Sequence, residues 1–193
     1  MTSRFSLQKM VLVEGGHMGS VIQDGNGKYY YVTLGMAADG TTLGALTTGA
    51  KGQMTVQPLD AKSMKEAVAL AKNDTMNSPY TDKVTFKTDS KTDQKIFNET
   101  GKKADMVNSG KENYNSLSNN CADGCENPIT SATGIAMSDN IYPNTNFGEI
   151  KQNKDKIQGK LDKKRKRALA PTVTIPSGLD GYPSKKLVLP VQK

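Results

Sequence analysis

The chain has 193 residues, which suits one domain or one domain with a tail. It has no Trp, 4 Phe and 7 Tyr, and its mean hydropathy is −0.58, so a core has to rest on aliphatic side chains and Met. No apolar run approaches the ~20 residues of a membrane-spanning helix. Integral membrane, collagen-like, coiled-coil and disulfide-stapled proteins are therefore excluded by composition and pattern.

The positive charge is concentrated in one segment. The chain carries 26 Lys plus Arg against 19 Asp plus Glu, and residues 151–167 hold nine basic and two acidic side chains, a net charge of +7. Residues 1–150 are close to neutral at −2, so no specific nucleic-acid partner is expected. Charge runs are usually solvated helix ends and linkers, and contact with nucleic acid or an anionic membrane is the alternative.

The N-terminal part of the chain predicts antiparallel strands. Residues 8–14 predict one strand, and residues 17–22 and 28–34 predict a hairpin. The dipeptides Asp24-Gly25 and Asn26-Gly27 between them favour tight turns. The first residues lack the long apolar stretch of a secretory signal peptide, so we expect synthesis in the cytoplasm.

A helix and another strand are expected next. Residues 35–52 are rich in Gly and Thr and predict a long loop, with a strand near Thr55-Val56. Asp60 is expected to cap a helix over residues 61–73, where apolar side chains recur at helical spacing. Residues 83–87 alternate in polarity and predict a strand.

Two further helices are predicted in the middle of the chain. Ser90 and Asp93 resemble a capping arrangement that opens a helix at about 91–104. Cys121 follows two Asn residues that can cap a helix, so a short helix is expected to begin there. Residues 126–148 are expected to be irregular because they contain two Pro residues.

The predicted organisation has three parts. Residues 1–150 form a domain of the α+β class, with a small antiparallel sheet packed on the helix that begins at Cys121. Residues 151–167 form a basic helical segment. Residues 168–193 carry four Pro and two Gly and predict an extended tail.

Candidate catalytic residues are few, because the chain contains one His and two Cys. A structural zinc site needs about four such ligands, so no metal is expected. No Walker loop, dinucleotide-binding glycine motif or G-x-S-x-G elbow occurs, and no cofactor is implied.

A Cys–His pair remains. Cys121 at a helix start would have backbone N–H groups to lower its thiol pKa and to hold an oxyanion. The small residues after it, Ala122-Asp123-Gly124, would leave room for a substrate. His17 is flanked by glycines at the start of a hairpin strand. The alternative is a surface His and a buried thiol that never meet.

Cys125 lies one helical turn after Cys121. A disulfide across one turn has poor geometry. The second cysteine is therefore a small core thiol or, alternatively, a redox gate on the nucleophile.

Several segments together resemble a known family. The runs G-H-M-G-S-V-I, K-Y-Y-Y-V-T-L-G, V-T-F-K-T-D, Y-N-S-L-S-N-N-C-A-D and P-N-T-N-F-G-E-I resemble the circularly permuted papain-like hydrolases of the NlpC type. The most similar members are the C-terminal toxin domains of bacterial RHS-repeat polymorphic toxins. The resemblance covers about residues 10–150.

The resemblance implies roles for particular residues. Cys121 matches the nucleophile, His17 the general base, and Asn120 the residue that shapes the turn. The family usually has a third polar group on the strand after the His strand. Tyr30, Tyr31 and Thr33 are available there, with Tyr31 as the third candidate. The usual Asp, His or Asn is missing from that strand, which leaves a Cys–His dyad or an inactive relative as alternatives.

The expected function is that of a cysteine-dependent amidase or peptidase acting by acyl transfer. The resemblance implies a bacterial toxin or effector domain that attacks peptidoglycan peptides or protein amides, is delivered to a target cell, and is neutralised by an immunity protein. An acyltransferase or deamidase on the same pair, and a non-catalytic binding module, are the alternatives.

Overall fold

In the computed structural model the described residues are 16–73, 82–138, 140–169, 172–173 and 187–188. A three-stranded antiparallel sheet contains β1 (Gly19–Gln23), β2 (Tyr29–Met36) and β3 (Gly52–Leu59), in the order β1-β2-β3. The helices are α1 (Thr42–Leu46), α2 (Met64–Asn73), α3 (Ser90–Asn108), α4 (Cys121–Thr133), α5 (Pro143–Gln152) and α6 (Lys154–Leu169). The described fold is therefore α+β, as the sequence predicts.

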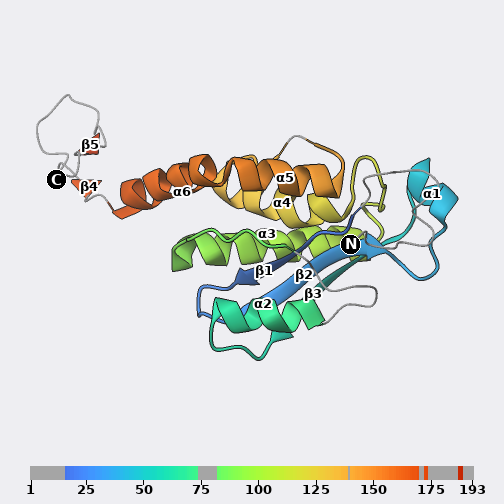
Figure 1. Ribbon diagram of the computed structural model, residues 1–193, viewed down its shortest axis with the longest axis horizontal. Coiled ribbons are helices and arrows are strands. Elements are labelled where there is room, and N and C mark those ends of the chain that lie inside the picture. The colour runs from blue at the N-terminus through green and yellow to red at the C-terminus, as the bar shows by residue number, and fades with distance from the viewer. Residues whose placement is uncertain (1–15, 74–81, 139, 170–171, 174–186, 189–193) are drawn as a thin grey trace, which may run out of the picture.

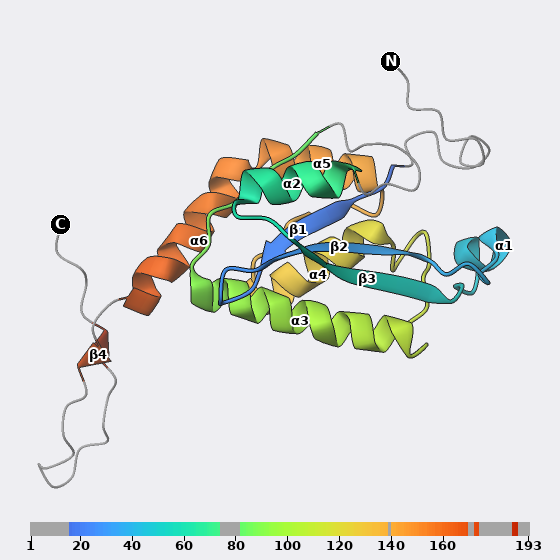
Figure 2. The ribbon, with the colours of Figure 1, turned by 90° about the horizontal axis from the view of Figure 1, so that it is seen from below.

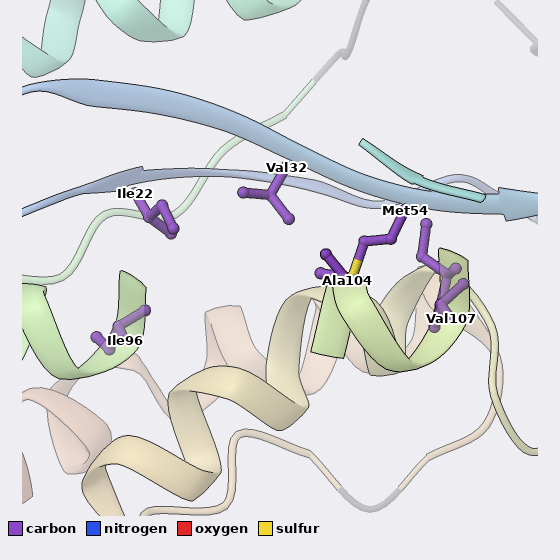
Figure 3. Close-up of a cluster of buried hydrophobic side chains, with 7 residues drawn as sticks. Ile22, Val32, Met54, Ile96, Ala104 and Val107 are labelled. Carbon is purple, nitrogen blue, oxygen red and sulfur yellow. The ribbon is translucent and has the colours of Figure 1, made fainter. Parts of the chain in front are cut away.

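The two faces of the sheet are covered by different helices (Figures 1 and 2). Tyr31 and Leu59 pack against Ala67 and Ala71 of α2 on one face. On the other face the sheet packs against α3, with α4 alongside it. Figure 3 shows the core between them, where side chains of the sheet (Ile22, Val32 and Met54) face side chains of α3 (Ile96, Ala104 and Val107).

The β1–β2 hairpin confirms the turn prediction. Its register pairs Gly19 with Thr33 and Gln23 with Tyr29. Oδ1 of buried Asp24 accepts 2.9 Å hydrogen bonds from the backbone N–H groups of Asn26 and Lys28, which closes the turn. The hydrogen bonds from these backbone N–H groups lower the pKa of Asp24, and the bond from Lys28 has the largest effect. The strand predicted over 8–14 lies outside the described residues.

Several predicted elements differ from the structure. The helix after β3 begins at Met64, because the Ser63 hydroxyl accepts from Glu66 N–H; Asp60 is not its cap. Residues 83–87 belong to no strand in the described sheets. The Gln158 side chain hydrogen-bonds both backbone groups of Lys87 and so holds this segment against α6.

The caps and ends of the longer helices also correct the predictions. Asp89 caps α3, and its side chain accepts from Thr92 N–H. α3 runs past the predicted end at residue 104. The prediction of irregular structure over 126–148 is wrong for residues 126–133, which continue α4 through Pro128, and for residues 143–148, which belong to α5. Pro128 lacks the N–H that would bond to the Gly124 carbonyl, and its ring crowds that carbonyl, but the helix continues past it.

The basic segment is packed on the body of the protein. Ile157 and Leu161 of α6 are buried in a cluster with Ile135, Met137 and Ile150. α6 therefore has an apolar side that faces the core, and its cations occupy the remaining surface. The predicted tail begins inside α6, which ends at Leu169, and beyond that helix the structure describes only Thr172–Val173 (β4) and Leu187–Val188 (β5), which pair antiparallel.

Candidate active site

Cys121 is the first residue of α4, as the sequence predicts. Asn120 is the N-cap, and its Oδ1 accepts a 2.8 Å hydrogen bond from Ala122 N–H. The carboxylate of Asp123 accepts from Asn120 N–H at 3.0 Å and completes a capping box. The start of α4 is thus fixed on both sides of the thiol.

Asn120 also holds the neighbouring loops. It is 2 % exposed, and its amide nitrogen donates to the backbone carbonyls of Ser116, at 3.2 Å, and Ile141, at 2.8 Å. All the polar atoms of this buried side chain are therefore satisfied. The shaping of the turn, which the resemblance implied, has a clear physical basis in these bonds.

The fold places the thiol against the segment that carries His17. The Met18 N–H donates to Cys121 Sγ at 3.4 Å, and Sγ lies 3.9 Å from the Gly16 carbonyl oxygen. These contacts join positions 103 and 105 residues apart in the chain. The two backbone groups flank His17, so the Cys and the His that the sequence singled out belong to one region of the fold.

Thr33 is a side-chain partner of the imidazole. His17 Nε2 and Thr33 Oγ1 are 2.6 Å apart. Thr33 is on β2, the strand where a third residue was expected. Tyr31, the candidate third residue, lies two positions along the same strand, is 5 % exposed, and packs beneath α2. Because side chains alternate along a strand, the sequence already places Tyr31 and Thr33 on the same face of β2. Only the tertiary structure shows that Thr33 is the one that lies beside the histidine.

The electrostatics differ from the sequence expectation. Burial raises the pKa of Cys121 to about 11, although the N–H of Met18 and those of Ala122 and Cys121 itself act in the opposite direction. His17 is partly exposed to solvent. The protein atoms that surround its ring still remove enough water to lower the pKa of the imidazole. Cys121 as a whole is 3 % exposed. At neutral pH the resting pair is therefore a neutral thiol and a neutral imidazole, not an ion pair.

The small residues after Cys121 do not provide space for a substrate. Ala122 is fully buried. A Cβ at Gly124 would overlap the Leu34 side chain on β2 and lie 3.1 Å from its Cδ2. The missing side chain lets α4 approach the sheet, so packing is the reason for a small residue at this position.

A cavity of about 650 Å³ begins beside His17 and Met18. It extends along β1 between α2, residues 82–88, and the packed helices α4 to α6, and much of its lining is apolar. Cys125 and Glu126 line it, whereas Cys121 does not. Met18 is the residue that both lines the cavity and contacts the thiol.

Cys125 is buried, and no disulfide joins it to Cys121. Burial raises its pKa. The core-thiol interpretation agrees with this burial, and a redox gate remains a hypothesis.

Comparison with known proteins assigns no family to the chain. No protein-family model matches the chain, no curated protein matches it, and no solved structure matches it. Within the described ranges no helix is long and apolar enough to cross a membrane. The same residues contain no cluster of three or more His, Cys, Asp or Glu side chains arranged to hold a metal ion.

Proposed function

We propose that the protein is a cysteine-dependent amidase or peptidase that acts by acyl transfer. The observation that carries the proposal is the contact of Cys121 Sγ with Met18 N–H and the Gly16 carbonyl, on either side of His17. The backbone on both sides of His17 thus contacts the thiol of Cys121, which begins a capped helix. A peptide amide, in peptidoglycan or in a protein, is the substrate class we propose from the resemblance to toxin domains.

In the proposed reaction the proton moves during attack. Sγ of Cys121 bonds to the carbonyl carbon, and the thiol proton passes to His17. The hydroxyl of Thr33 holds the imidazole ring through Nε2 while the proton moves. The C–N bond then breaks, the amine leaves with the proton from His17, and water hydrolyses the thioester. A neutral imidazole suits this role, because only the unprotonated ring can act as a base.

Access to the thiol requires a movement of the Gly16–Met18 segment. Cys121 is 3 % exposed and lies behind the backbone that lines the cavity. The substrate would therefore occupy the cavity beside His17, and the segment would move to admit the carbonyl group. An acyltransferase or deamidase would use the same first step with a different acceptor or leaving group.

A non-catalytic binding module is the second candidate function. The burial of Cys121 and the pKa of about 11 favour it, because they describe an unreactive core thiol. In that case the cavity beside His17 is the binding site, and no acyl enzyme forms.

The test is acyl-enzyme formation with a p-nitrophenyl ester of an N-acetylated amino acid, followed by intact-mass and peptide analysis. We expect one adduct on Cys121, with a rate that rises through a pKa below 6.5. Cys121→Ser should lose the adduct. His17→Ala should lose this inflection and at least tenfold in rate at neutral pH. Cys125→Ala is the matched control and should keep both.

Thr33→Val tests the positioning of the imidazole. Thr55, the cross-strand neighbour of Thr33, offers the control Thr55→Val. Loss of the Thr33 hydroxyl should shift the pH profile of acylation, whereas the control should leave it unchanged. No adduct on Cys121, or equal labelling with and without His17, would leave the binding module as the better description.

A further inference from the structure

The structure contains a second cavity whose chemistry is unlike that beside His17. It has a volume of about 310 Å³ and lies where α6 passes the start of α3, next to the segment held by Gln158. Figure 2 shows this segment running along α6 before α3 begins. We call this cavity the basic cleft. Its six cationic side chains are Lys87, Lys91, Lys95, Lys164, Arg165 and Arg167.

The cations come from parts of the chain that the sequence does not connect. Three belong to the near-neutral body, and three belong to α6. Asp89 is the one acidic residue in the lining, and its carboxylate is already used to cap α3. The fold therefore adds lysines from the body to the basic segment, and the basicity is not confined to a solvated helix end.

Few of these charges are compensated. Arg165 pairs with Asp162 at 3.2 Å. Among the described residues, the other five cations of the cleft form no ion pair. Like charges held in one concave site repel each other and lower stability, so their collection around a cavity is typical of an anion-binding surface.

The surrounding backbone favours the same ligand. The cleft includes the first turn of the 19-residue helix α3, whose N-terminal end carries partial positive charge. Two of the three arginines in the chain line the cleft, and guanidinium groups can bind phosphate oxygens in a bidentate manner. The volume lies at the lower end of the range for small-ligand sites, which favours a compact anion.

We propose that the basic cleft binds a small ligand that carries two or three consecutive phosphate groups. One phosphate is too little charge for six cations, and a nucleic-acid duplex needs a more extended surface than a small concave site. The proposal does not depend on the chemistry at Cys121. A diphosphate or triphosphate could be free or belong to a nucleotide, and both forms present the same chemistry to the cleft.

The test compares two variants of equal charge by calorimetric titration with inorganic tripolyphosphate at 150 mM NaCl. Each replaces three exposed lysines or arginines, none of which has an ion pair in the described structure. The cleft variant is Lys91→Gln, Lys164→Gln, Arg167→Gln. The control variant, on the part of α6 outside the cleft, is Lys154→Gln, Lys156→Gln, Lys160→Gln.

We expect the cleft variant to bind tripolyphosphate at least tenfold more weakly than the wild type, and the control less than threefold. The contrast follows because charges beyond about 8 Å are screened at this salt concentration. Adenosine triphosphate in a parallel titration distinguishes a free polyphosphate from a nucleotide. Equal weakening in both variants would overturn the proposal, as would no binding by the wild type at 1 mM. Binding of duplex DNA without binding of tripolyphosphate would replace it with a nucleic-acid surface.

Discussion

The approach of α4 to the sheet at Gly124 gives the sharpest test of how the fold positions the site. In Gly124→Ala the added methyl group would overlap Leu34, whose side chain is fully buried, and would lie 3.1 Å from its Cδ2 and 3.3 Å from its Cγ. Ordinary carbon–carbon contacts are about 3.5–4.0 Å. Part of the overlap is with the Cβ of Leu34, which is fixed to β2, so α4 has to move away from the sheet.

The expected cost follows from two opposing terms. Overpacking a core of this kind costs about 1–3 kcal/mol. Replacing Gly by Ala inside a helix returns about 1 kcal/mol of helix propensity. Because the Cβ of Leu34 is fixed to β2 and cannot move aside, the upper part of the overpacking range applies, about 2–3 kcal/mol, and we expect a net loss of about 1–2 kcal/mol in the free energy of unfolding. For a chain of this size that lowers Tm by about 2–8 °C.

The matched control is Gly101→Ala in α3, where an added Cβ would meet nothing within 4 Å. It should gain about 0.5–1 kcal/mol from helix propensity alone. Thermal unfolding by circular dichroism measures both variants. In folded Gly124→Ala, Cys121 should also react faster with iodoacetamide at pH 8, because a shift of α4 disturbs the 3.4 Å contact with Met18 N–H. If both variants are stabilised to the same extent, the argument from close approach is refuted.

Two further predictions concern the start of α4. Asn120→Ala should lower the free energy of unfolding by about 2–3 kcal/mol in urea denaturation, because it removes the cap and two buried donors. Asp89→Ala, which removes one capping bond in α3, should cost only about 1 kcal/mol, and equal losses would contradict this difference. For Cys121, the pKa is raised from 9.0 to about 11, so between these pH values the folded state keeps a proton that the unfolded chain has lost. Stability should be complete below pH 9 and fall by about 2 kcal/mol by pH 11. Cys121→Ser should show a shallower fall in Tm over this range, and an unchanged slope would refute the raised thiol pKa.

Local signals predicted the elements that carry the site. The Asp-Gly and Asn-Gly dipeptides identified the hairpin, whose turn is closed by bonds within residues 24–28. The helix that begins at Cys121 was predictable because the Asn120 cap and the Asp123 carboxylate are its immediate neighbours. These features depend on contacts between residues a few positions apart, which a sequence pattern records directly.

The predictions that failed depended on partners distant in the sequence. Residues 83–87 alternate like a strand, but no strand in the described part of the chain pairs with them, and the side chain of Gln158 on α6 bonds both backbone groups of Lys87. The expectation of a lowered thiol pKa counted the helix start and omitted the burial of Cys121. Tyr31 and Thr33 share a face of β2, and the approach of the His17 segment decided between them. Each result requires the tertiary arrangement.

The sequence by itself determined the α+β class, the hairpin and the capped helix start, and it singled out the two candidate catalytic residues. Those properties follow from short-range turn chemistry, capping and residue type. Only the tertiary structure decided that Cys121 lies against the backbone on either side of His17, that its thiol is buried, and that lysines from the body join α6 in the basic cleft. The reason is physical: burial and charge clustering depend on which distant segments pack together, and spacing along the chain does not record that packing.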